Sequence, residues 1–140
     1  MIYANIFQAL NAAKVRYVVV GGVAVILHGH IRFTFDLDLI VELKPRNLLK
    51  FIQAMQKLGY VPRLPVRAED FAVDSIRESW RKEKNMKVFS FIHSKDHEAG
   101  IIDVFVHEPI PFANLHKDKL VAVAQNIRIP VVSLDHLLLL

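Results

Sequence analysis

Apolar residues recur along this chain at two spacings, and the change from one to the other divides the sequence into predicted helices and strands. A spacing of three to four residues, as in Ile2, Ile6 and Leu10, predicts an amphipathic helix. Short continuous or alternating apolar runs, as in Val18–Val20, predict strands. The predicted helices are residues 2–13, 23–28, 46–58, 75–80 and 134–140. The predicted strands are residues 16–20, 33–41, 60–61, 71–73, 86–93, 101–106, 120–124 and 127–132.

Glycines, prolines and polar clusters interrupt this pattern and indicate how the elements are connected. The turn at residues 95–100 predicts that residues 86–106 form an antiparallel hairpin. Residues 81–85 are predicted to form a polar loop, and Ser133 is predicted to cap the last helix. The whole pattern predicts an α/β (α+β) fold with a mixed, mostly antiparallel sheet and helices mainly on one side.

Length and composition narrow the class of protein. At 140 residues the chain is expected to form one domain, residues 1–140. Its apolar runs are much shorter than the roughly 18 residues of a membrane span, and its N-terminus lacks the basic start of a signal peptide. The absence of cysteine excludes disulfides and thiol catalysis, so we expect a cytoplasmic protein with no membrane partner. The net charge of +4 favours phosphate-bearing partners, although it also fits simple solubility.

Two aspartates early in the second long strand are candidate metal ligands. Asp36 and Asp38 stand two residues apart, so a strand places both carboxylates on one face. Neighbouring carboxylates repel unless a cation lies between them, and oxygen ligands suit Mg²⁺. Taken alone, the pair is more typical of a solvated strand end. Asp103 changes this balance, because an aspartate inside the apolar run 101–106 requires a cation, an arginine or another donor.

Four further residues near the aspartates are candidates for binding a phosphate. Gly21 and Gly22 lie between a strand and a helix, where glycines let the backbone approach a ligand, although an ordinary tight turn would use them too. Arg32 and Thr34 alternate with phenylalanines and therefore share the face of the aspartates. Both could bind phosphate. Alternatively, Arg32 could form a structural ion pair, and Thr34 could be an ordinary strand residue.

Taken together, these residues resemble the signature of the DNA polymerase β-type nucleotidyltransferase superfamily. Over residues 17–41 the sequence is most similar to small bacterial and archaeal nucleotidyltransferases, including those of abortive-infection and toxin–antitoxin type. The residues that carry the resemblance are Gly21-Gly22, His28-Gly29, Arg32, Thr34, Asp36-Leu37-Asp38 and Ile102-Asp103-Val104.

This resemblance implies a nucleotidyltransferase-like fold and a metal-dependent reaction. It implies that Gly21 and Gly22 hold the β- and γ-phosphates of a nucleoside triphosphate. Asp36 and Asp38 would bind two Mg²⁺ (or Mn²⁺) ions, and Asp103 would join them at the ion that activates the attacking hydroxyl. A nucleoside monophosphate would then pass to an acceptor, and pyrophosphate would leave.

The acceptor and the biological setting stay open at this point. One alternative is a catalytically silent module that binds a nucleotide or a partner protein in a toxin–antitoxin-like system; a weaker one is a drug-modifying enzyme of aminoglycoside type. The acceptor could be a tRNA-like RNA or a protein. The basic segment 77–87, with Trp80 as a base-stacking residue, is a candidate RNA surface, but a solvated charged face is the simpler interpretation.

The chain ends on four consecutive leucines, Leu137–Leu140. Such an end is expected to be buried, to contact a second copy or a partner protein, or to belong to a helix that is cut short. Members of the resembling group usually continue this last helix, so a C-terminally truncated domain is one expectation.

Overall fold

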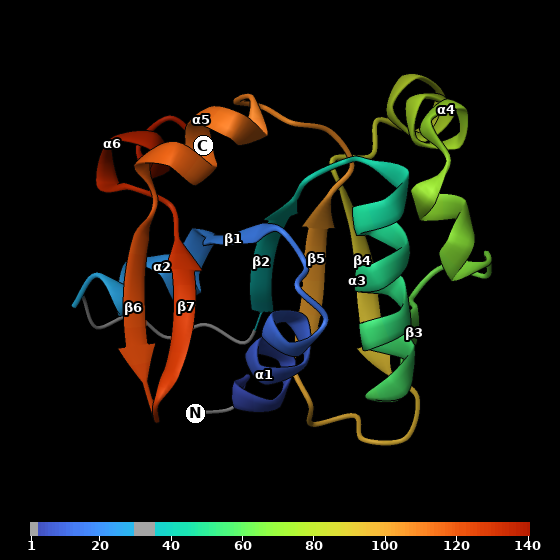
Figure 1. The fold of residues 1–140 in the computed structure, drawn as a ribbon. Helices are drawn as coiled ribbons and strands as arrows, with labels where there is room; N and C mark the ends of the chain where they lie inside the picture. Colours follow the sequence, from blue (N-terminus) through green and yellow to red (C-terminus); the bar gives the residue numbers. More distant parts are fainter. Residues whose placement is uncertain (1–2, 30–35) are drawn as a thin grey trace.

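The computed structural model describes residues 3–29 and 36–140, and these residues form one mixed sheet with helices packed against it (Figure 1). In the described part of the chain the sheet has seven strands in the order β3-β4-β5-β2-β1-β7-β6. The strands are β1 (Tyr17–Val20), β2 (Asp36–Val41), β3 (Tyr60–Pro62), β4 (Val88–His93), β5 (Ile101–Phe105), β6 (Leu120–Ala124) and β7 (Ile127–Val131). Only the β2–β5 and β1–β7 pairs are parallel among the described strands, so the predicted mixed, mostly antiparallel sheet is confirmed.

Helices cover the sheet because each turns an apolar stripe toward it. The helices are α1 (Ala4–Ala12), α2 (Gly21–Leu27), α3 (Pro45–Lys57), α4 (Asp74–Lys84), α5 (Phe112–Asp118), α6 (Leu134–Leu137) and the 3₁₀ helix η1 (Ala68–Ala72). In Figure 1, α1 and α3 lie in front of the sheet. Helix α3 begins with Pro45 at its first turn, where a missing N–H costs nothing. It buries Leu48, Phe51, Ile52 and Met55, which recur at helical spacing.

An aromatic cluster joins α3, η1 and α4 to the β4 side of the sheet. The ring of Phe89 stacks between Phe71 at 5.2 Å and Trp80 at 4.9 Å. Phe91 meets Phe51 edge-on at 5.7 Å. All five rings are buried, and rings of this size contribute much of a core's apolar area.

Two predictions for the middle of the chain are wrong. Residues 71–73 do not form an edge strand, because residues 68–72 wind into η1 and bury Phe71. Residues 81–84 are not loop but the last turn of α4, and the helix ends only where Asn85 adopts a left-handed conformation with φ of 51°. The predicted turn at 75–80 therefore belongs to a longer helix, which buries Arg77 and Trp80 and exposes the charged residues of its last turn.

The two C-terminal hairpin strands and the last helix follow their predictions, although α6 is shorter than expected. β6 and β7 pair antiparallel, and Ser133 Oγ accepts a hydrogen bond from the N–H of His136 at 3.2 Å, which confirms the predicted cap. Leu137 packs on the core, whereas Leu138 is 84% exposed, so the burial expected for the leucine run holds only for its start. A contact of these leucines with another chain stays a prediction. No helix in residues 3–29 and 36–140 has the length and apolarity needed to cross a membrane.

Candidate active site

Parallel strands β2 and β5 bring the three predicted aspartates to one face of the sheet. Asp38 lies directly opposite Asp103, and Asp36 lies opposite Ile101. Because side chains alternate along a strand, the carboxylates point away from Leu37, Leu39 and Ile102, which are buried in the core. The three aspartates are half-buried. The apolar alternation that builds the core is therefore also what aligns the carboxylates.

The Asp103 carboxylate is held by a neighbouring strand. Ser90 lies opposite Asp103 in the antiparallel β4–β5 pair, and its hydroxyl donates a hydrogen bond to Asp103 Oδ1 at 2.5 Å. A bond of this length to a carboxylate is among the stronger hydrogen bonds in proteins. The bond fixes one oxygen of Asp103 and leaves the other available. The sequence analysis missed Ser90, although its position opposite Asp103 follows from the predicted hairpin.

Gly21 forms the other wall of the site, against Asp38. Its φ of +67° favours glycine, and helix α2 starts at this residue rather than two positions later. A Cβ at Gly21 would overlap Asp38 Oδ2 and lie 2.9 Å from Asp38 Cγ. The glycine is thus required for the backbone after β1 to approach the Asp38 carboxylate. Gly22 follows it in the first turn of α2 and is buried.

The carboxylates repel one another. Burial raises the pKa of Asp36, the charge of Asp103 raises it further, and the Arg63 guanidinium lowers it. Arg63 follows β3, and its N–H donates to the carbonyl of Ser90 at 2.9 Å. The sequence analysis missed Arg63, which stands between two prolines in a stretch without periodicity. Only the pairing of β3 with β4 brings it to the site.

Tyr3 is a third residue near the site that the sequence did not indicate. It is 3% exposed, and its pKa is raised above its ordinary value by burial and by the charges of Asp36, Asp38 and Asp103, together with Tyr60. A tyrosine in the first turn of a predicted helix carries no signal of such a location. Its hydroxyl stays protonated and is a neutral neighbour of the negatively charged face.

The described side chains do not form a ready-made three-ligand metal site. Across residues 3–29 and 36–140, no three His, Asp or Glu side chains lie close enough together to ligate one ion. This agrees with the chemistry of Mg²⁺, which commonly uses one or two carboxylates and completes its shell with water and substrate phosphates. Asp38 and Asp103, in register on adjacent strands, supply such a pair of oxygen ligands.

Four other residues singled out in the sequence remain to be placed. Arg32 and Thr34 lie outside the described residues. His28 Nε2 lies 2.9 Å from the carbonyl of Val132 and donates to it in the tautomer protonated at that nitrogen, so it links α2 to the end of β7. Trp80 is 5% exposed and stacked on Phe89, which rules out the base-stacking role considered for it.

A mixed sheet of this order places the molecule in the nucleotidyltransferase fold class. The chain belongs to a family described as nucleotidyltransferase of unknown function (DUF6036), whose profile matches residues 2–138. The membership confirms the resemblance seen in the sequence, and it makes the protein a nucleotidyltransferase by family. No curated protein sequence matches the chain as a relative.

Two solved structures share the fold at low sequence identity. One is a Thermotoga maritima protein with a provisional nucleotidyltransferase assignment, 15% identical, with a TM-score of 0.61 over 96% of this chain and 76% of that one. The other is the lincosamide antibiotic adenylyltransferase LnuA with lincomycin bound, 19% identical, with a TM-score of 0.60 over 96% of this chain and 80% of that one. At these identities the likeness concerns the fold alone.

Proposed function

We propose that this protein transfers a nucleoside monophosphate from a nucleoside triphosphate to an acceptor hydroxyl and requires Mg²⁺ or Mn²⁺. The bond between the acceptor oxygen and the α-phosphorus forms, the bond from that phosphorus to the β-phosphate oxygen breaks, and the hydroxyl proton leaves to solvent. The observation that carries the proposal is the register of Asp38 with Asp103 beside Gly21, which places two carboxylates next to an open backbone turn.

The donor set fits a hard divalent cation. Asp36, Asp38 and Asp103 offer oxygen ligands only. Burial and, after it, the charge of Asp103 raise the pKa of Asp36, so a cation there would favour its ionised form. When bound, two such ions neutralise the phosphates and polarise the attacking and leaving oxygens. We assign Asp36 and Asp38 to the pair of ions, and Asp103 together with Asp38 to the ion that would activate the acceptor hydroxyl, with water and phosphate oxygens as its other ligands.

The nucleotide would lie against the turn after β1. Gly21 is partly exposed there, and the absence of a side chain at Gly21 lets the backbone lie against the Asp38 carboxylate. We assign the triphosphate to this turn, with Arg32 and Thr34, from the sequence, as further phosphate-binding residues. Ser90 and Arg63 position and balance the carboxylates from the β3–β4 side.

Metal-dependent nucleotide binding and transfer test the proposal together. We expect the purified protein to bind a nucleoside triphosphate in a calorimeter only with Mg²⁺ or Mn²⁺. In whole-cell lysate it should move label from an α-³²P nucleotide onto RNA, protein or a small molecule. Asp38→Asn and Asp103→Asn should each slow transfer by about 10³-fold, because several kcal/mol of charge stabilisation is lost. Normal transfer by both variants would refute the two-metal assignment.

A matched carboxylate change serves as the control. Asp74→Asn alters an aspartate at the first turn of α4, which is ion-paired with Arg77 and lies outside the site. It should leave nucleotide binding and transfer unchanged. Nucleotide binding without label transfer to any acceptor would instead identify a silent binding module, whereas label confined to a drug would identify a drug-modifying enzyme. Co-purification of a small partner protein would test the toxin–antitoxin setting.

A further inference from the structure

Two hollows lie next to each other on the helix-covered side of the sheet. The first, about 470 Å³, opens between the end of α1, the start of β1, α5 and β7. The second, about 440 Å³, lies between α1 and α3. Ala13 lines one and Lys14 lines the other, so only the turn after α1 separates them. We call the two adjacent hollows together the basic groove.

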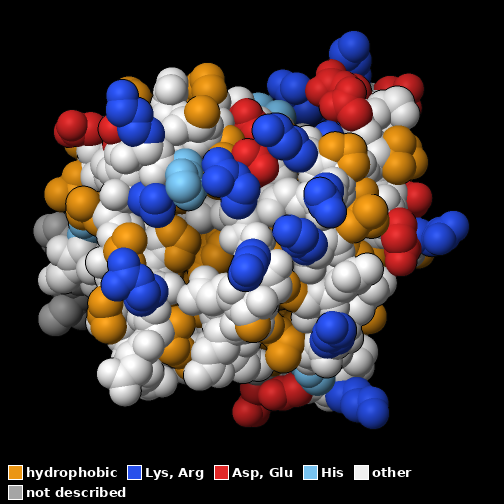
Figure 2. Space-filling model, in the orientation of Figure 1, with side chains coloured by type: hydrophobic (Ala, Val, Ile, Leu, Met, Phe, Trp, Pro, Cys, Tyr) orange, Lys and Arg blue, Asp and Glu red, His pale blue; other side chains and the backbone are white. Residues whose placement is uncertain are grey.

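The groove is lined by cations and by no acidic residue. Its Lys and Arg residues are Lys14, Arg16, Lys50, Lys57, Lys119 and Arg128. In the part of the chain that the structure describes, Arg16 is the only one of the six in an ion pair, with Glu42 at 3.0 Å. Figure 2 shows this face, where Lys and Arg side chains spread across the centre and acidic side chains gather mostly toward the outline. The face therefore carries positive charge that the protein does not neutralise.

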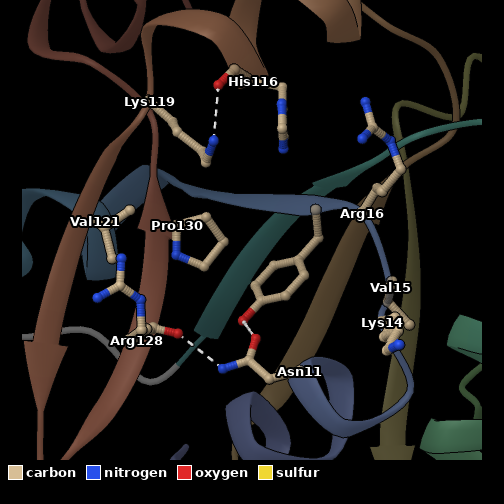
Figure 3. A pocket seen from close by; sticks show the side chains of 10 residues that line it. Asn11, Lys14, Val15, Arg16, His116, Lys119, Val121, Arg128 and Pro130 are labelled. Atoms are coloured by element: carbon tan, nitrogen blue, oxygen red, sulfur yellow. Dashed lines mark hydrogen bonds between the residues drawn. The ribbon is translucent and has the colours of Figure 1, made fainter.

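Hydrogen bonds between distant segments fix the walls of the first hollow (Figure 3). Asn11 donates to the carbonyl of Arg128 at 2.8 Å and accepts from the Tyr17 hydroxyl at 2.9 Å. Lys119 Nζ donates to the carbonyl of His116 at 3.1 Å. Figure 3 shows Lys119 and His116 on one side of the opening and Arg128 on another. The walls are thus set before any ligand arrives.

The groove and the carboxylates lie on opposite faces of the sheet. Tyr17 and Val20 are three positions apart on β1, so their side chains point to opposite faces. Tyr17 bonds to α1 at the groove, whereas Val20 pairs with Asp38 and shares its face. The groove is therefore not the triphosphate site.

We propose that the basic groove binds the sugar–phosphate backbone of a polynucleotide. Six cations spread over two adjacent hollows match a repeating negative charge better than a single phosphate group. Lysine and arginine without acidic partners are the usual means by which proteins contact phosphates, and such contacts carry no sequence information. The aromatic ring at the groove, Tyr17, is 2% exposed and cannot stack on a base. Recognition therefore concerns the backbone, and it does not depend on the nucleotidyl transfer proposed above.

Charge reversal with a matched control tests the proposal. A fluorescein-labelled 20-nucleotide RNA is titrated by anisotropy against the wild type, without triphosphate or metal, over a series of salt concentrations. The logarithm of the binding constant should fall against log salt with a slope of about −3 to −4, as expected for four to six phosphate contacts on a single strand. Lys14→Glu with Lys57→Glu, one change in each hollow, should weaken binding at least about tenfold and reduce the slope by about 2.

The control is Lys82→Glu with Lys84→Glu on α4, which makes the same change in net charge at two exposed lysines outside the groove. It should change affinity by less than about threefold. Equal losses in both double variants would overturn the proposal, because net charge alone would then explain binding. Arg128→Ala gives a milder test in case the first variant unfolds, and circular dichroism checks the fold of each protein.

Competition experiments separate the polynucleotide from other anions. Unlabelled DNA of the same length should displace the RNA, whereas polyglutamate of equal charge and inorganic phosphate should not. Displacement by polyglutamate at the same concentration as RNA would overturn the proposal in favour of an acidic protein partner. Asp38→Asn should bind RNA like the wild type, so failure of nucleotidyl transfer and failure of this proposal can be told apart.

Discussion

Helix α4 and the β2–β5 face that carries the three aspartates both contain several charged side chains. Opposite charges pair on α4, whereas like charges adjoin on the β2–β5 face. On α4, Arg81 pairs with Glu78 at 3.0 Å and Arg77 pairs with Asp74 at 3.3 Å. Arg77 is also buried, and it donates to the carbonyl of Phe71 at 2.7 Å. On the β2–β5 face, charges of the same sign lie side by side, and the charge of Asp103 adds to burial in raising the pKa of Asp36.

The two regions therefore differ in how their charges are arranged, and we infer that like charges held side by side are the better candidate for a ligand site. The charges of α4 compensate one another within one or two turns, so the segment needs no external ligand. The carboxylates carry an unfavourable interaction that a cation would relieve. The basic groove is the positive counterpart, since five of its six cations lack an ion pair in the described residues. The predictions that follow separate these cases, from the largest expected effect to the smallest.

Removing the indole ring of Trp80 from α4 should have the largest effect on stability. Trp80→Ala deletes a ring that is 5% exposed and stacked on Phe89, so we expect a loss of about 3–5 kcal/mol in the free energy of unfolding. Urea denaturation followed by circular dichroism measures it. Lys82→Ala, an exposed position two residues further along α4, should change stability by less than about 0.5 kcal/mol. A loss below 1 kcal/mol for Trp80→Ala would mean that α4 is not anchored by this ring.

Adding one methyl group at the turn should damage the carboxylate face specifically. In Gly21→Ala the new Cβ would overlap Asp38 Oδ2, so Asp38 must move. A displacement of about 1 Å can lower transfer about 10²-fold. The comparison is Gly29→Ala, which also has a positive φ but no described atom within 4 Å of the new Cβ. Both variants should lose about 1–2 kcal/mol from backbone strain, and only Gly21→Ala should lose metal-dependent nucleotide binding. Equal nucleotide binding by Gly21→Ala and Gly29→Ala would show that Gly21 does not contribute to the site.

The serine that bonds to Asp103 should have a smaller effect. Ser90→Ala removes the 2.5 Å hydrogen bond to Asp103 Oδ1, and we expect transfer to fall about tenfold, as for other groups that orient a metal ligand. The apparent Mg²⁺ affinity, from titration of nucleotide binding, should weaken by a similar factor. Ser79→Ala is the matched control, because Ser79 bonds to Glu83 at 3.2 Å in the same way on α4. Ser79→Ala should leave the transfer rate and the apparent Mg²⁺ affinity unchanged. An unchanged Mg²⁺ affinity in Ser90→Ala would show that Ser90 does not orient a metal ligand.

Local patterns explain which features could be predicted from the sequence. The two-residue spacing of Asp36 and Asp38, and the single acid in the run 101–106, depend only on strand geometry, so they could be located in advance. Helix α4 was predicted too short because residues 81–84 contain no apolar position. The ion pair of Arg81 with Glu78 in the preceding turn supports the helix there, and apolar periodicity does not reveal it.

Features that depend on the tertiary fold were not predictable. Arg63 and Tyr3 come near the carboxylates only after β3 pairs with β4 and α1 packs on the sheet. The basic groove draws its cations from positions 14 to 128, with no common motif. No local pattern of residues marks such a surface, and the modest net charge of the chain hides it.

The pKa of His116, which lines the basic groove, should change when a polynucleotide binds, and this is the smallest of the expected effects. Burial lowers the pKa of His116, and Lys119 and Arg16 lower it further against the opposing effect of Glu42. Protonation of His116 is thus disfavoured in the folded state, so this contribution to stability is present above pH 6.5 and is lost as the pH falls through the lowered pKa.

A bound polynucleotide would bring phosphates near the His116 ring and raise its pKa again. An NMR titration of the His116 ring proton, assigned with His116→Gln, should show this rise on adding RNA. His107, whose pKa is lowered by burial and by Arg81 and Lys87, lies beside α4 and should not respond. The pKa of both histidines is lowered in the free protein. A rise confined to the pKa of His116 would place the polyanion at the basic groove, whereas a rise in both pKa values would show only a change in overall charge.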